Sequence, residues 1–159
     1  LQHVWERARG SSAREVIIAT DDERIAETAE AFGAQVCMTG DQHRSGTERI
    51  AEVCDLRDWP DDLIVVNLQG DEPTMPAELI DQCAGLLQES TADVATLASP
   101  LVSQDDVDTP NVVKVVWGGD WDRLLEADVP QVVAARIAGW ASSHSQSIRS
   151  SPAHGFTVK

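Results

Sequence analysis

Short apolar runs rich in branched side chains alternate with amphipathic helical patterns along most of this chain, and this alternation constrains its fold more than any other feature. The strand patterns cover residues 15–20, 34–38, 63–68, 94–98 and 112–116, and the helical patterns cover residues 1–8, 25–32, 50–54 and 79–87. Strands that alternate with helices are typical of parallel sheets joined by right-handed crossovers. The sequence therefore predicts an α/β fold with a mostly parallel sheet flanked by helices.

Length and composition narrow the possible partners. A chain of 159 residues with 42% hydrophobic content can form one domain with a sizeable core. Its formal charge of −15 argues against a nucleic-acid polymer or an anionic membrane as partner, because both require a basic surface. A small anion such as a nucleotide stays possible, since it needs only local donors and a metal ion.

The cysteines and the lack of export signals predict a cytoplasmic location. Cys37, Cys54 and Cys83 are odd in number and show no C-x-x-C spacing. No run approaches the roughly 20 apolar residues of a membrane span, and the first residues show no signal-peptide pattern. We therefore expect reduced thiols and neither export nor membrane insertion.

An apolar run that ends in polar groups marks the first candidate site. Residues 65–68 are followed by Gln69, Gly70, Asp71 and Glu72. Glycine allows a sharp turn, and open α/β sheets bind ligands at the carboxyl ends of their strands. Carboxylates there would suit Mg²⁺ and a polyphosphate. The alternative is a surface turn fixed by Pro73, with both acids in water.

A second candidate site is the segment 43–49, His-Arg-Ser-Gly-Thr-Glu-Arg, between a strand and a helix. Ser45 or Thr47 can cap that helix, and the bare backbone of Gly46 would let a ligand approach the free N–H groups of the first turn. The alternative is an ordinary capped turn with Arg44 and Arg49 in solvent.

Two further groups of charged residues lie near predicted strands. Asp21 and Asp22 follow the first strand pattern, and a helix cap explains them better than metal binding. Lys114 lies in an apolar run, where a lysine sits at a sheet edge or faces an anion in a cleft. The sequence leaves these two alternatives for Lys114 open.

Read together, six segments resemble the 3-deoxy-manno-octulosonate cytidylyltransferases, also called CMP-Kdo synthetases. They stand in family order and at family spacing over residues 1–116: His-Val-Trp-Glu-Arg-Ala from 3, Val-Ile-Ile-Ala-Thr-Asp from 16, Val-Cys-Met-Thr from 36, the segment 43–53, the segment 65–73 and Pro-Asn-Val-Val-Lys-Val-Val from 110. Each segment alone is weak evidence, but the ordered series is specific.

The resemblance implies transfer of CMP from CTP to Kdo with release of pyrophosphate, for lipopolysaccharide biosynthesis, on a Rossmann-like sheet of the nucleotide-diphospho-sugar transferase type. It also implies that Asp71 binds Mg²⁺ and acts with Lys114 in catalysis, that Gln69 contacts the sugar acid, and that Arg44, Ser45 and Gly46 bind CTP. Family members are homodimers, although their dimer strands are not recognisable here.

Departures from the family pattern predict a domain truncated at both ends. Family members begin with a strand and a basic loop of the form P-A-R-x-x-S-x-R-L-P-G-K-P, whereas this sequence starts in the following helix. We divide the chain into a partial nucleotide-binding domain, 1–116, and a weakly structured tail without family motifs, 117–159. The entire net charge lies within 1–116, and the tail is rich in serine and tryptophan. We expect little or no turnover from these residues alone.

The break in pattern at Trp117 suggests that the tail is translated in a shifted reading frame. Resequencing the coding DNA tests this hypothesis, and a tail confirmed in frame and supported by related chains would contradict it.

Two other functions fit parts of the sequence. A CMP-sialic acid synthetase or another nucleotide-sugar transferase would keep the nucleotide and change the acceptor. A phosphoacceptor receiver module would use Asp21, Asp22, Asp71 and Lys114 in a similar order along the chain. Receivers, however, place a methionine three residues after the acceptor aspartate, whereas Met75 lies four residues after Asp71.

Overall fold

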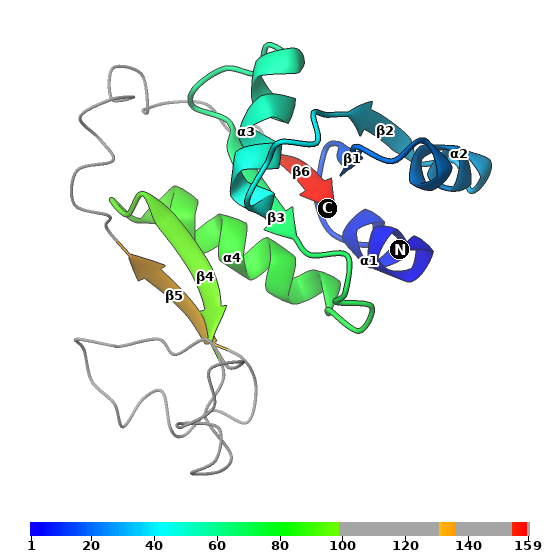
Figure 1. The fold of residues 1–159 in the computed structure, drawn as a ribbon. Coiled ribbons are helices and arrows are strands. Elements are labelled where there is room, and N and C mark those ends of the chain that lie inside the picture. The colour runs from blue at the N-terminus through cyan, green and yellow to red at the C-terminus, as the bar shows by residue number, and fades with distance from the viewer. Residues whose placement is uncertain (99–130, 136–153, 159) are drawn as a thin grey trace, which may run out of the picture.

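The fold was analysed in a computed structural model, which describes residues 1–98, 131–135 and 154–158. Helices and strands alternate through the first 98 residues, as the sequence predicts (Figure 1). In chain order the elements are α1 (Gln2–Arg9), β1 (Val16–Thr20), α2 (Glu23–Ala31), β2 (Gln35–Met38), α3 (Gly46–Leu56), β3 (Ile64–Leu68), α4 (Ala77–Glu89), β4 (Val94–Ala98), β5 (Gln131–Ala135) and β6 (His154–Val158).

Four strands form a parallel sheet in the order β2-β1-β6-β3. Ile18 pairs with Val36 of β2 on one side and with Val158 of β6 on the other, and Leu68 of β3 also pairs with Val158. The α/β fold with a parallel sheet and flanking helices is therefore confirmed. The strand β4 departs from the predicted series, because it pairs antiparallel with β5 in a separate two-stranded sheet.

Two segments of the tail that the sequence predicts to be weakly structured form strands. Residues 131–135 and 154–158 are strands, and β6 lies in the interior of the parallel sheet although it is the last strand in the sequence (Figure 1). A strand between two partners can satisfy backbone N–H and C=O groups on both edges. The predicted strand at 112–116, with Lys114, lies outside the described residues.

Helices cover both faces of β1, which makes this strand the centre of the core. All five of its residues are buried, because α1, α2 and α4 pack on one face and α3 packs on the other. The larger cluster comprises Val4, Ala8, Val16, Ile18, Ala29, Ala34, Leu68, Ile80 and Ala84. Ile17 points to the opposite face, where α3 carries the buried residues Ile50 and Val53.

Local chemistry explains where the helices begin and end. The side chain of Asp22 caps α2 by accepting a hydrogen bond from the backbone N–H of Arg24 at 2.8 Å. After α2 the chain turns at Gly33, whose φ of +87° favours glycine over residues with a β-carbon. Pro76 precedes α4, and its fixed φ suits the start of a helix.

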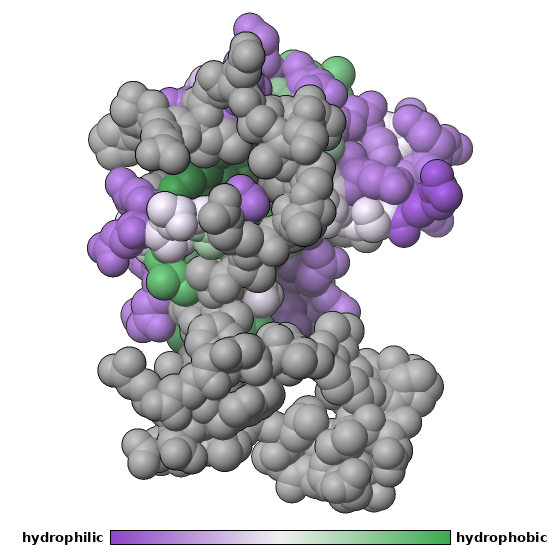
Figure 2. Space-filling model, turned by 90° about the vertical axis from the view of Figure 1, so that its left-hand side faces the viewer, coloured by the Kyte–Doolittle hydropathy of each residue, from purple (hydrophilic) through white to green (hydrophobic). Residues whose placement is uncertain are grey.

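On the side shown in Figure 2, hydrophilic residues cover much of the described surface, and apolar residues appear in smaller patches between them. Within the described part of the chain, each helix is too short or too polar to cross a bilayer.

Truncating the centre of the core tests the packing of β1. The Ile18→Ala substitution should lower the free energy of unfolding by about 2–5 kcal/mol, because Ile18 is 0% exposed and its removal leaves a cavity. The matched control is Ile25→Ala, since Ile25 is 42% exposed; its effect should stay within about 0.5 kcal/mol. Urea unfolding of both variants measures the difference, and equal losses would contradict the described core.

Candidate nucleotide-binding site

The loop from Thr39 to Ser45 leads from β2 into the first turn of α3, and a reciprocal pair of hydrogen bonds fixes that turn. The hydroxyl of Ser45 accepts from the backbone N–H of Glu48 at 3.2 Å, and the carboxylate of Glu48 accepts from the backbone N–H of Arg44 at 2.8 Å. This arrangement is close to a capping box. Ser45, not Thr47, is therefore the cap, and Gly46 is the first residue of the helix.

Arg49 is buried beneath this loop, with 8% of its surface exposed. Its guanidinium donates to the hydroxyl of Thr39, to the carbonyl of Gly40 at 3.1 Å and to the carboxylate of Asp21 at 3.0 Å. The hydrogen bond from Arg49 is the main reason why the pKa of Asp21 is lowered. The alternative that both arginines are in solvent is thus wrong for Arg49, whereas Arg44 is exposed.

Glu52, one turn further along α3, binds the same loop. Its carboxylate accepts from the backbone N–H of Gly40 at 2.9 Å and also contacts the imidazole Nε2 of His43. The hydrogen bond with His43, followed by the one with Gly40, lowers the pKa of the Glu52 carboxyl. The side chains of His43 and Glu52 are 12% and 28% exposed, so water reaches this pair only in part.

The outer side of the loop borders a groove of about 450 Å³. Its lining residues are Gln42, His43, Arg44, Glu48, Ala51, Glu52 and Asp55. Three of them are carboxylates, which repel phosphate unless a cation lies between. A phosphate is therefore better accommodated on the side of the helix N-terminus, where Ser45 and Gly46 lie.

The second candidate site is the loop between β3 and α4. Gln69, Asp71 and Glu72 are exposed here, and the side-chain amide of Gln69 donates to the side-chain carbonyl of Asn67 at 2.8 Å. The backbone turns through hydrogen bonds from Glu72 N–H to Gln69 C=O and from Met75 N–H to Glu72 C=O, both 3.2 Å long. These turns follow the end of β3 and leave the carboxylates of Asp71 and Glu72 in water, which is the alternative that the sequence left open.

The donor set at this loop fits a weakly held magnesium ion. Among the described residues, no group of three His, Cys, Asp or Glu side chains could hold a metal ion by itself. Mg²⁺ commonly keeps several waters and is bound by one or two carboxylates together with substrate phosphates. An exposed Asp71 suits a metal ion that arrives with a nucleotide, whereas a permanent all-protein metal site would need more ligands.

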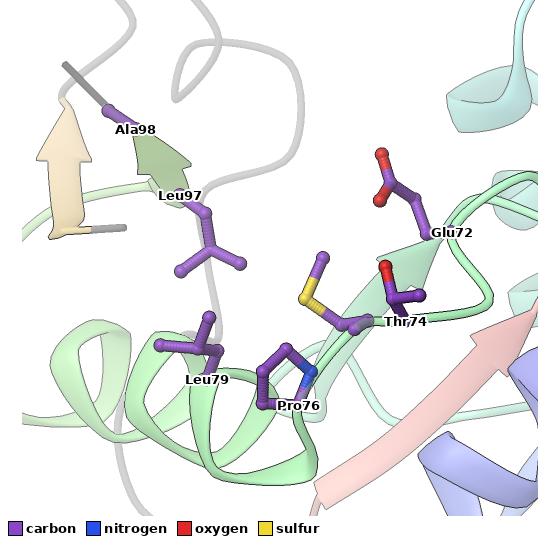
Figure 3. Close-up of a pocket in the computed structure, with 7 residues that line it drawn as sticks. Glu72, Thr74, Pro76, Leu79, Leu97 and Ala98 are labelled. Carbon is purple, nitrogen blue, oxygen red and sulfur yellow. The ribbon is translucent and has the colours of Figure 1, made fainter. Parts of the chain in front are cut away.

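A cavity of about 300 Å³ lies beside this loop, between α4 and β4 (Figure 3). Its apolar wall consists of Met75, Pro76, Leu79, Leu97 and Ala98. Leu79 from α4 and Leu97 from β4 point toward each other, and Glu72 and Thr74 bring polar groups to the opposite side. Asp71 does not line this cavity.

Both loops follow the carboxyl ends of strands in the parallel sheet, but they border different cavities. One follows β2 and the other follows β3, and two strands separate β2 from β3, which corresponds to a spacing of about 14 Å. The structure thus divides the predicted site residues between two loops, with Arg44, Ser45 and Gly46 after β2 and Gln69 and Asp71 after β3, while Lys114 lies outside the described residues. A nucleotide with its metal ion would have to connect the two loops.

Sequence analysis did not predict the network in which the buried Arg49 binds Asp21 and, with Glu52, holds Gly40. A signal for Arg49 exists in the helix period: with Ile50 and Val53 it lies on the buried stripe of α3. A charged side chain on such a stripe requires a partner. The sequence favours a helix cap for both Asp21 and Asp22, but Asp22 alone caps α2.

Comparison with known proteins identifies the family. The profile of a family described as cytidylyltransferase matches residues 1–138. The chain belongs to the cytidylyltransferase family. The match extends past residue 116, where the motifs recognised in the sequence end, so the resemblance is longer than those motifs indicate. The division into two domains stays a prediction.

Curated members of the cytidylyltransferase family are about half identical to this chain. The 3-deoxy-manno-octulosonate cytidylyltransferase 1 of Actinobacillus pleuropneumoniae serotype 5b is 50% identical over 116 residues, which cover 73% of this chain and 46% of that protein. The enzyme of Thioalkalivibrio sulfidiphilus is 52% identical over 142 residues, covering 81% and 57%. The chain therefore spans about half the length of the curated relatives it matches.

A solved cytidylyltransferase structure shares the fold. It is described as CMP:2-keto-3-deoxy-manno-octonic acid synthetase complexed with CTP, and it matches with a TM-score of 0.53 and 36% identity over 62% of this chain and 42% of that chain. The cytidylyltransferase match leaves the receiver-module alternative without support.

Acid should destabilise the loop network in a defined pH window. The pKa of Glu52 is lowered from 4.5, so folding favours its charged form. This stabilisation is complete above pH 4.5 and is lost as the pH falls through the lower pKa of the folded state. Chemical unfolding between pH 3 and 7 should show the loss, and Glu52→Gln should reduce the slope below about pH 4.5. An unchanged slope in the variant would contradict the assignment.

Proposed function

We propose that this protein transfers CMP from CTP to 3-deoxy-manno-octulosonate, releasing pyrophosphate, in lipopolysaccharide biosynthesis. The family match carries this proposal, because relatives with this name are 47–52% identical to the chain. The structure adds support, since both candidate loops leave the carboxyl edge of a parallel sheet, where α/β proteins bind nucleotides.

Each candidate site residue has a proposed role that fits its chemistry. The N-terminus of α3, with Ser45 and Gly46, offers backbone N–H groups to the nucleotide, and the exposed Arg44 offers positive charge. Gln69 supplies amide donors and acceptors for the sugar acid. Asp71 would hold Mg²⁺, which offsets phosphate charge during the in-line attack on the α-phosphorus. Lys114 is proposed as a further anion contact.

The proposal also includes a cellular location and an oligomeric state. Cys37, Cys54 and Cys83 are free thiols, which suits a reducing cytoplasm, where CTP is available. A homodimer, as in the family resemblance, is proposed for the whole protein. A CMP-sialic acid synthetase remains the second candidate from sequence, and product analysis with both sugar acids separates the two.

Binding of CTP by the chain tests the role of Asp71. With Mg²⁺ present, Asp71→Asn should weaken CTP binding at least about tenfold, because a neutral amide is a poor ligand for a hard cation. Without Mg²⁺ the two proteins should bind CTP equally weakly. Isothermal titration with and without the metal ion measures both effects.

The control is Asp58→Asn, the same chemical change at an exposed position between α3 and β3. Asp58 has a φ of 49°, a conformation that asparagine adopts readily, so folding should not change. Metal-independent CTP binding, or the same affinity in both variants, would contradict the proposed role of Asp71.

A further inference from the structure

The loop 39–45 is held by two side chains of α3, Arg49 and Glu52, although it is polar and lies at the protein surface. Asp21 follows β1, whereas Arg49 and Glu52 lie on α3. Arg49 and Glu52 contact Thr39, Gly40 and His43 of the loop, and Arg49 also binds Asp21. Such anchoring is unusual for an exposed loop, which ordinarily gains few contacts and moves freely.

Arg49 connects the loop with the end of β1. Its guanidinium reaches a carboxylate 28 residues earlier in the chain and two groups of the loop itself. The planar guanidinium has donors in a fixed fork, so it imposes one relative position on the groups it binds. A lysine at this position would keep the charge but could not reproduce this geometry.

Glu52 binds the loop at two further points. One is the backbone N–H of Gly40, and the other is the imidazole of His43. Arg49 donates to the carbonyl of the same Gly40. Both polar backbone groups of this glycine therefore have partners on α3. The two residues thus hold the loop at its first turn and near its end.

We propose that Arg49 and Glu52 are positioning residues that hold the loop 39–45 in the shape that presents Ser45 and Gly46 to a cytidine nucleotide. This inference rests on the proposed function. The network leaves little conformational entropy to be lost on binding, so affinity depends on side chains that do not touch the nucleotide. The residues are too deeply engaged with the loop to serve as phosphate contacts themselves.

Two measurements on the same variants test the proposal. Glu52→Gln keeps the side-chain volume and removes the negative charge. Arg49→Lys keeps the positive charge and removes the planar guanidinium group. Amide hydrogen exchange of Thr39 and Gly40 should accelerate about tenfold or more in each variant, because charge-assisted hydrogen bonds are lost. CTP binding with Mg²⁺ should weaken about fivefold or more. The control is Glu27→Gln on the exposed face of α2, which should change neither quantity.

The outcomes separate this inference from the function on which it rests. Unchanged exchange at Thr39 and Gly40 in a folded Glu52→Gln protein would overturn the positioning role. Faster exchange together with unchanged CTP affinity would also overturn it. If the unsubstituted chain fails to bind CTP while exchange still accelerates in the variants, the proposed function fails and the loop anchoring stands. If the Arg49→Lys protein does not fold, the Glu52→Gln protein still tests the positioning role.

Discussion

Burial of β1 on both faces is the constraint on which the rest of the structure depends. A strand covered by helices on both sides cannot shift its register without moving apolar side chains into water or into the wrong layer. Its carboxyl end is therefore fixed, and with it Asp21 and Asp22. The first of these acids holds Arg49 and thereby α3, and the second begins α2. These contacts therefore fix the position of the candidate nucleotide loop relative to the core.

The electrostatics explain how an acidic chain could bind a nucleotide. With a net charge of −15, the long-range field repels a polyphosphate, and the groove outside the loop carries three carboxylates. Binding then requires local donors, such as the N-terminus of α3, and a divalent cation that screens the phosphates. Of the two arginines in the segment 43–49, Arg49 is buried in its network and Arg44 is exposed.

Local features of the fold could be predicted from the sequence, and long-range features could not. The strand and helix positions through residue 98 follow from periodicity, and the cap at Ser45 follows from residue type and spacing. The pairing of β6 between β1 and β3 could not be foreseen, because register and partner depend on chain segments far apart. The contact between Asp21 and Arg49 has the same origin, although the position of Arg49 on a buried stripe gave a hint.

We propose that the loops after β2 and β3 enclose one metal–nucleotide complex, although about three strand spacings separate the two strands. Paramagnetic broadening tests it directly: Mn²⁺ replaces Mg²⁺, and the backbone amide signals are recorded with and without CTP. CTP should cause broadening in both loops, at Gly70 and Asp71 and also at Ser45 and Gly46. Broadening confined to one loop, or independent of CTP, would contradict it.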